Sequence, residues 1–130
     1  MILLDTDVCI EILHRNERIF YKQKLENSPA AISFMTAAEL YYGASKSSCV
    51  AVNIEIIEEF LLTVDIIQSD LAIIRTYGQL KSRLELAGMA LADADLLIAA
   101  TAIEKCEKLI TGNTRHYSRI TQLSIENWLR

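Results

Sequence analysis

Carboxylates occur at three places where an apolar segment of the chain ends or begins, and two further polar groups follow a fourth such segment. These five residues are Asp5, Glu39, Asp95, Asn113 and His116. Carboxylates within about 4 Å of each other repel by roughly 4 kcal/mol at an effective dielectric constant of 20. A fold of ordinary stability would not gather three of them for capping alone. A divalent cation removes this conflict, and a set of oxygen ligands favours Mg²⁺ or Mn²⁺ over zinc. The pattern therefore indicates phosphoryl chemistry, in which a metal polarises a phosphate and activates a water.

Each acid also has a structural interpretation. Thr36 and Glu39 have the spacing of a capping box, and this motif on its own favours a role at a helix start. Asp5 or Asp7 could cap the first helix in the same way. Taken singly, each acid is better explained by structure, and only their convergence favours chemistry.

Asp93 and Asp95 cannot serve the same purpose. Two residues apart on a helix corresponds to about 200° of rotation, so the two side chains cannot both face one metal. One of them is then a ligand and the other a cap. The spacing leaves open which is which.

The elements that must position these residues alternate between strands and helices. Short apolar runs at 2–4, 30–33, 64–67 and 108–111 predict strands, and 123–125 is expected to add an edge strand. Helical patterns follow the first strand and cover 18–26, 36–45, 49–62, 69–87, 93–107 and 114–117, with Gly88 placed to end the longest of them. This alternation predicts an α/β sandwich with a mainly parallel central sheet of four to five strands. Ligands bind outside the carboxyl ends of such strands, so the acids are expected to meet at one edge.

Length and composition exclude several classes of protein. The chain of 130 residues is expected to form one domain over 1–130, and 52% hydrophobic against 23% charged residues excludes disorder. A net charge of −4 argues against a clamp for duplex DNA but not against a metal-dependent nuclease. No apolar stretch is long enough to span a bilayer and no leader is evident, so a soluble cytoplasmic protein is expected. Cys9, Cys49 and Cys106 lack metal-ligand spacing and are expected to be reduced and at least partly buried.

Four motifs in order resemble the PIN-domain nucleases and, more narrowly, the VapC-type toxins of toxin–antitoxin pairs. They lie at 3–7, 36–43, 94–102 and 111–117, and the likeness extends to the closing residues 125–128. The resemblance implies a PIN-like fold and an endoribonuclease, dependent on Mg²⁺ or Mn²⁺, that cleaves RNA and arrests translation. It maps the family's first three acids onto Asp5, Glu39 and Asp95, which leaves Asp93 as the cap. It also implies a small VapB-like antitoxin that lays an apolar segment into a groove, and a homodimer.

The chain departs from the family pattern after the last core strand, where many PIN nucleases carry a fourth acid. Asn113 and His116 stand there instead. His116 is a candidate for orienting a water, contacting the scissile phosphate or covering the site, with a structural role as the alternative. Thr6 and Asn113 are expected to hold the acids by hydrogen bonds. Arg115 and Arg119 are candidates for phosphate contacts, and a solvated surface role is the alternative.

Two other functions compete with the nuclease. The Asp5-Thr-Asp7 sequence also fits the opening of a haloacid-dehalogenase-like phosphatase, in which the first Asp is the nucleophile. That fold expects a later Lys and acidic pair, for which this chain has no convincing candidates. A catalytically inactive PIN scaffold that binds protein or RNA is the non-enzymatic alternative.

Overall fold

A computed structural model describes all of residues 1–130. Along the chain the elements are β1 (Ile2–Leu4), α1 (Thr6–Leu13), α2 (Glu17–Leu25), β2 (Ala30–Ser33), α3 (Phe34–Ser45), α4 (Val50–Leu61), β3 (Asp65–Ile67), α5 (Leu71–Leu86), α6 (Asp93–Lys105), β4 (Lys108–Ile110), α7 (Thr114–Tyr117) and β5 (Ile125–Glu126). None of the helices is both long and apolar enough to cross a membrane.

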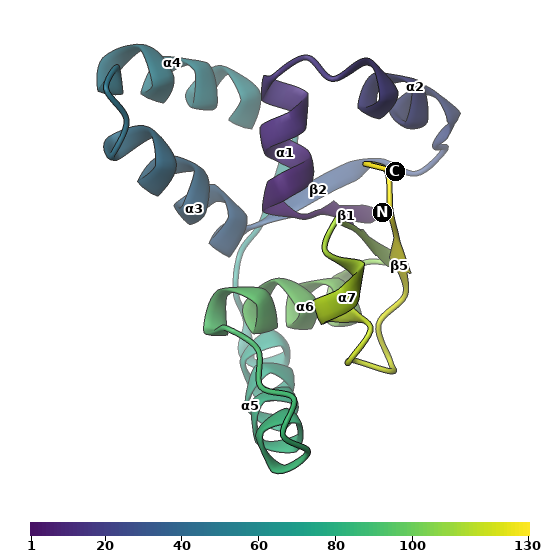
Figure 1. Cartoon of the computed structure of the whole chain (residues 1–130). Coiled ribbons are helices and arrows are strands. Elements are labelled where there is room, and N and C mark those ends of the chain that lie inside the picture. Colours follow the sequence, from purple (N-terminus) through teal and green to yellow (C-terminus); the bar gives the residue numbers. More distant parts are fainter.

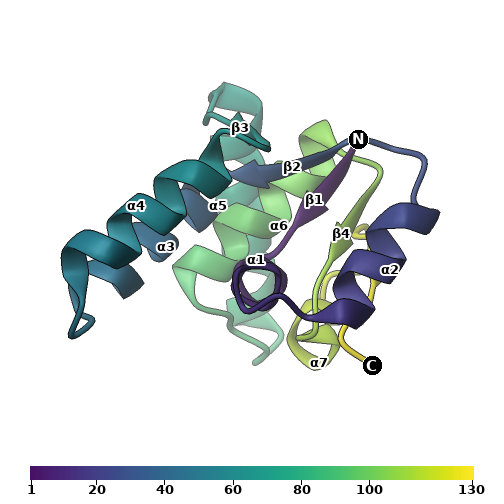
Figure 2. The same cartoon turned by 90° about the horizontal axis from the view of Figure 1, so that it is seen from above.

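The five strands form one parallel sheet in the order β3-β2-β1-β4-β5. Strand β1 is central, and its three residues are buried on both faces, which explains its continuous rather than alternating apolar sequence. Figure 2 shows β2, β1 and β4 side by side, with α1 seen end-on where β1 finishes. The α/β fold and the parallel sheet predicted from the sequence are confirmed, and every pairing is parallel.

Helices cover both faces of the sheet and give two hydrophobic cores. Ile2 and Leu4 point into a core shared with α1, α2, α3 and α4, which lie above the sheet in Figure 1. Leu3 points the other way, into a core formed with α5, α6 and the ring of Tyr117. Helix α6 is buried along most of its length, as its nearly all-apolar sequence predicts. The three layers place the carboxyl ends of β1, β2 and β4 at one edge.

Most element boundaries fall within one or two residues of the predicted ones. Helix α5 ends at Leu86, and Gly88 follows with a φ of 69°, a left-handed conformation that favours glycine. The edge strand β5 is shifted toward the C-terminus relative to 123–125. The expectation that all three cysteines are at least partly buried is wrong for Cys49, which is exposed before α4.

Candidate active site

The carboxylate of Asp5 is fixed at the end of β1 by donors from two segments. Asp5 is the N-cap of α1, and its Oδ1 accepts a hydrogen bond from the Thr6 backbone N–H at 2.8 Å. Its Oδ2 accepts from the Thr111 hydroxyl at 2.7 Å, across 106 residues of sequence. Asp5 is only 6% exposed. It therefore caps the helix and also supplies a buried carboxylate at the predicted edge.

Asp95 meets Asp5 through the hydroxyl of Tyr117. This hydroxyl lies 3.5 Å from Asp5 Oδ1 and 3.4 Å from Asp95 Oδ1. Asp95 is in the first turn of α6, and Tyr117 closes α7 beyond β4. Three elements thus converge on one pair of carboxylates.

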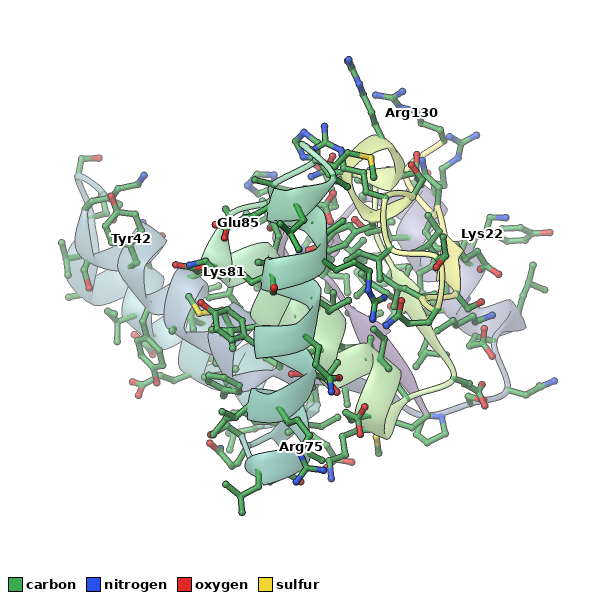
Figure 3. The ribbon with its side chains drawn as sticks, turned by 90° about the horizontal axis from the view of Figure 1, so that it is seen from below. Lys22, Tyr42, Arg75, Lys81, Glu85 and Arg130 are labelled. Atoms are coloured by element: carbon green, nitrogen blue, oxygen red, sulfur yellow. The ribbon has the colours of Figure 1, made fainter.

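Asp93 is held by partners on α5 and lies apart from this pair, and the role of Asp95 as a metal ligand stays a prediction. Its Oδ1 accepts from Lys81 Nζ at 2.9 Å and from the Tyr77 hydroxyl at 2.8 Å. Lys81 lies on the outer helix α5 in Figure 3. The prediction that Asp93 caps α6 is wrong, because the N-cap is Ala92 and the Asp93 carboxylate is drawn to α5 instead.

Glu39 joins the site through Thr6. The Thr6 hydroxyl donates to Glu39 Oε1 at 2.7 Å and lies 3.1 Å from the Thr36 hydroxyl. The capping-box interpretation of Thr36 and Glu39 is wrong. Helix α3 already begins at Phe34, capped by the Ser33 hydroxyl, so Glu39 lies beyond the first turn and is free to face α1.

The sequence did not identify Asp7 as a member of the site. Its Oδ2 accepts from the Gly112 backbone N–H at 2.9 Å, while its buried Oδ1 has no hydrogen-bond partner. A Cβ on Gly112 would lie 2.8 Å from Asp7 Oδ2 and would collide with the Leu129 side chain, so a larger residue would require both side chains to shift. The Asp5-Thr6-Asp7 sequence directly after a strand is the signal that could have identified Asp7 as a site residue. Asp5 precedes α1, so helical geometry does not force the side chains of Asp5 and Asp7 to opposite sides.

Burial and mutual repulsion raise the proton affinities in this cluster. Burial raises the pKa of Asp5 to about 7, and the charges of Asp7 and Asp95 add to the effect. Burial likewise raises the pKa of Asp7, with a contribution from Asp95. The pKa of Tyr117 is raised by burial and by the same three carboxylates, so its hydroxyl keeps its proton. Without a countercharge, Asp5 and Asp7 therefore hold their protons more tightly than free carboxyl groups do.

The donor set fits a hydrated divalent cation better than a fully protein-ligated one. No three acidic, histidine or cysteine side chains stand close enough to ligate a single ion directly. Asp5 and Asp95 are paired through Tyr117, and Glu39 is reached through Thr6. Mg²⁺ commonly keeps several waters and binds proteins through one or two carboxylates. The partnerless Oδ1 of Asp7 is a buried acceptor of the kind that a cation or its waters would satisfy.

The loop after β4 supports the site from the other side. The Asn113 backbone N–H donates to the Thr111 hydroxyl at 2.9 Å, and the Asn113 side-chain nitrogen lies 2.9 Å from Nδ1 of the exposed His116. Arg115 is exposed, whereas one guanidinium nitrogen of Arg119 donates to the Ala90 carbonyl at 3.1 Å. His116 makes no hydrogen bond to an acid, and its role and those of the two arginines stay predictions.

A hydrophobic groove runs from the site between α1, α3 and α4. It has a volume of about 330 Å³ and reaches Glu39 at the site. Ile10 and Ile56 contribute exposed apolar surface to it. His14 is the C-cap of α1 and borders this groove.

Comparison with known proteins identifies the family. The model of the PIN domain matches residues 2–122. The chain is 34% identical over 129 residues to the ribonuclease VapC2 of Rickettsia felis, covering 97% of this chain and 96% of the relative. It is 32% identical over 127 residues to the tRNA(fMet)-specific endonuclease VapC of Shigella flexneri, with coverage of 97% and 96%.

The fold agrees with these relationships. The crystal structure of VapBC2 from Rickettsia felis, bound to a DNA fragment from its promoter, superimposes with a TM-score of 0.91 at 34% identity, covering 98% of this chain and 99% of that chain. The resemblance inferred from the four motifs is confirmed. The match to the PIN domain favours a nuclease over the haloacid-dehalogenase-like phosphatase. This chain belongs to the PIN-domain family and, within it, to the VapC group.

Proposed function

We propose that this protein is a metal-dependent endoribonuclease toxin that hydrolyses RNA phosphodiester bonds and is neutralised by a VapB-like antitoxin. The observation that carries the proposal is the pairing of Asp5 and Asp95 at the carboxyl edge of a parallel sheet, with Glu39 linked through Thr6. Membership of the VapC group, whose relatives are named as ribonucleases, supports the choice of RNA as substrate. The loss of growth expected of such a toxin follows from cleavage of RNA needed for translation.

Within this proposal, Asp5 and Asp95 hold Mg²⁺ or Mn²⁺, directly or through bound water. The bound metal supplies a Lewis acid for the phosphate and a water of lowered pKa. Glu39 completes the acid cluster and orients a water, and its contact with Thr6 fixes its direction. Asn113 holds the loop that carries Thr111, the donor to Asp5. Arg115 and Arg119 are the proposed phosphate contacts.

The proposed place of the antitoxin is the groove between α1, α3 and α4. Its apolar lining suits the hydrophobic segment of a small partner, and its end at Glu39 brings that partner to the acids. Crystal structures of relatives are VapBC complexes, which supports an antitoxin as the partner. We also propose a homodimer, as the family resemblance implies.

Cleavage by the purified protein tests the proposed activity. Structured RNAs, including initiator tRNA, are incubated with wild-type protein or Asp5→Asn in Mn²⁺, with and without EDTA. Cleavage by the wild type that EDTA and Asp5→Asn both abolish is expected. Equal RNA loss in the variant or in EDTA would point to a contaminating nuclease. A folded wild type that cuts no RNA in the panel would favour the inactive scaffold instead.

A further inference from the structure

The Tyr117 hydroxyl occupies a position that its packing alone does not explain. The side chain is fully buried among the α5 and α6 core residues. Its hydroxyl has two hydrogen-bond acceptors, Asp5 Oδ1 at 3.5 Å and Asp95 Oδ1 at 3.4 Å. A phenol with one proton therefore stands between two carboxylates that come from different ends of the sequence. A phenylalanine would fill the same core without meeting either acid.

The hydroxyl approaches the acid pair from the interior of the protein. Tyr117 is 0% exposed, whereas Asp95 is half-buried and opens to solvent. A carboxylate oxygen has two lone pairs, so a donor on the inner side leaves the outer lone pairs free. The hydroxyl thus contacts the pair from a fully buried side chain, whereas Asp95 keeps part of its surface exposed.

Asp95 depends on this hydroxyl more than Asp5 does. Asp5 also accepts hydrogen bonds from Thr6 and Thr111. The Asp95 carboxylate has the Tyr117 hydroxyl as its one hydrogen-bond partner in the structure. A carboxylate in the first turn of a helix otherwise rotates among its rotamers, and a metal would have to order it on binding.

We propose that Tyr117 is a positioning residue that orients Asp95 toward Asp5 and so presents a preformed carboxylate pair to the divalent cation. This inference rests on the proposed metal-dependent function. Donors behind a metal-binding carboxylate fix its direction, and their loss commonly weakens metal binding by 10- to 100-fold.

Substitution of Tyr117 by phenylalanine tests the inference without removing the ring. Mn²⁺ binding is measured by the electron paramagnetic resonance signal of free Mn²⁺, and RNA cleavage is measured across a Mn²⁺ titration. We expect Tyr117→Phe to bind Mn²⁺ about tenfold more weakly. Cleavage should fall at limiting Mn²⁺ and return toward the wild-type rate at saturating Mn²⁺, because Asp5 and Asp95 themselves remain.

Tyr77→Phe is the matched control. The hydroxyl of Tyr77, on α5, also donates a hydrogen bond to an aspartate, but this aspartate is Asp93, which is not part of the site. This variant should keep the wild-type Mn²⁺ affinity, and melting temperatures in EDTA check that both variants are folded. A Tyr117→Phe protein that binds Mn²⁺ within twofold of the wild type would overturn the positioning role while the nuclease proposal stands. A wild type that binds no Mn²⁺ would overturn the metal dependence, and this inference with it.

Discussion

At the residue scale, the pKa of Asp5 is subject to opposing effects. Donors from Thr6 and Thr111 stabilise its charged form, but burial and the neighbouring acids destabilise that form more, and its pKa rises to about 7. The folded protein then binds a proton more tightly than the unfolded chain between about pH 4 and 7. Stability of the metal-free protein is expected to fall as pH rises through this range, by roughly 4 kcal/mol from this group, and to level off above pH 7.

The difference in melting temperature between the wild type and Asp5→Asn measures the contribution of the Asp5 carboxyl group to stability. Asparagine keeps an acceptor for the Thr6 N–H and carries no charge. In EDTA the variant is therefore expected to melt at least as high as the wild type, with a gap that widens from pH 4 to 7. Thermal melts over this range check it. An unfolded Asp5→Asn protein would instead make the charged Asp5 a structural requirement.

Asp7 gives a second expectation at this scale. Its Oδ2 is paired with Gly112, but its Oδ1 is buried without a partner and close to other acids. Asp7→Asn retains an acceptor for the Gly112 N–H and removes the unpaired charge. The free energy of unfolding in EDTA should rise by about 1 kcal/mol, measured by urea denaturation. A loss of stability would mean that the charge itself holds the loop after β4.

The sequence located the three candidate acids by their position in the fold, and missed contacts between residues that are far apart in the chain. Asp5, Glu39 and Asp95 each stand at a strand end or helix start, which the apolar pattern locates. Thr111 and Tyr117 reach Asp5 across 106 and 112 residues, and no local spacing records such a contact. The capping-box motif predicts a capping role for Glu39 because the motif describes residues that are close in sequence. The hydrogen-bond partner of Glu39 is Thr6, which is 33 residues away.

At the scale of elements, the two glycines inside helices offer a matched pair of positions. Gly43 on α3 lines the groove beside Glu39, and Gly78 lies on the exposed face of α5. A Cβ at either position would meet nothing within 4 Å. Glycine inside a helix costs up to about 1 kcal/mol relative to alanine, so leucine at either place should leave the fold as stable or more so.

Gly43→Leu should nevertheless block the antitoxin, because the new side chain fills the groove between α1, α3 and α4. We expect its affinity for the proposed VapB-like antitoxin to fall at least tenfold, measured by isothermal titration calorimetry. Gly78→Leu should bind as the wild type does. Equal affinity of both variants would place the antitoxin on another surface.

Element order and layers were predictable because they follow from apolar periodicity, whereas helix starts depend on single caps. The sequence placed the start of α3 at Thr36, two residues late, because the Ser33 hydroxyl can cap only once β2 has delivered it to the sheet edge. Likewise, Asp93 would be a plausible cap in an isolated α6. The packing of α5 against α6 brings Lys81 and Tyr77 to it and removes it from that role.

At the scale of the whole molecule, the acids gathered at the candidate site differ from the ion-paired acids elsewhere in having no basic partner. Several surface acids have basic partners, such as Glu26 and Glu126 with Lys108. Asp5, Asp7, Asp95 and Glu39 have no ion pair, and their hydrogen bonds come from neutral donors. The proposed divalent cation would supply the countercharge, so Mn²⁺ should raise the melting temperature of the wild type but not that of Asp5→Asn. Equal shifts in both would indicate a cation bound elsewhere.

The concentration of uncompensated charge at an accessible edge also predicts how the protein behaves in a cell. Induced expression of the wild type is expected to arrest growth, because the intact acid cluster can take up cellular Mg²⁺ and cleave RNA. Asp5→Asn should accumulate to the same level without arrest, since it loses the activity but keeps the fold. Co-expression of the proposed VapB-like antitoxin should relieve the arrest by the wild type but not that by Gly43→Leu, whose acids are intact and whose groove is filled. Growth curves, immunoblots and sequencing of RNA 5′ ends after induction check these outcomes together. Unimpaired growth with abundant soluble wild-type protein would contradict the toxin assignment, and arrest by Asp5→Asn would show that growth inhibition does not require the acid pair.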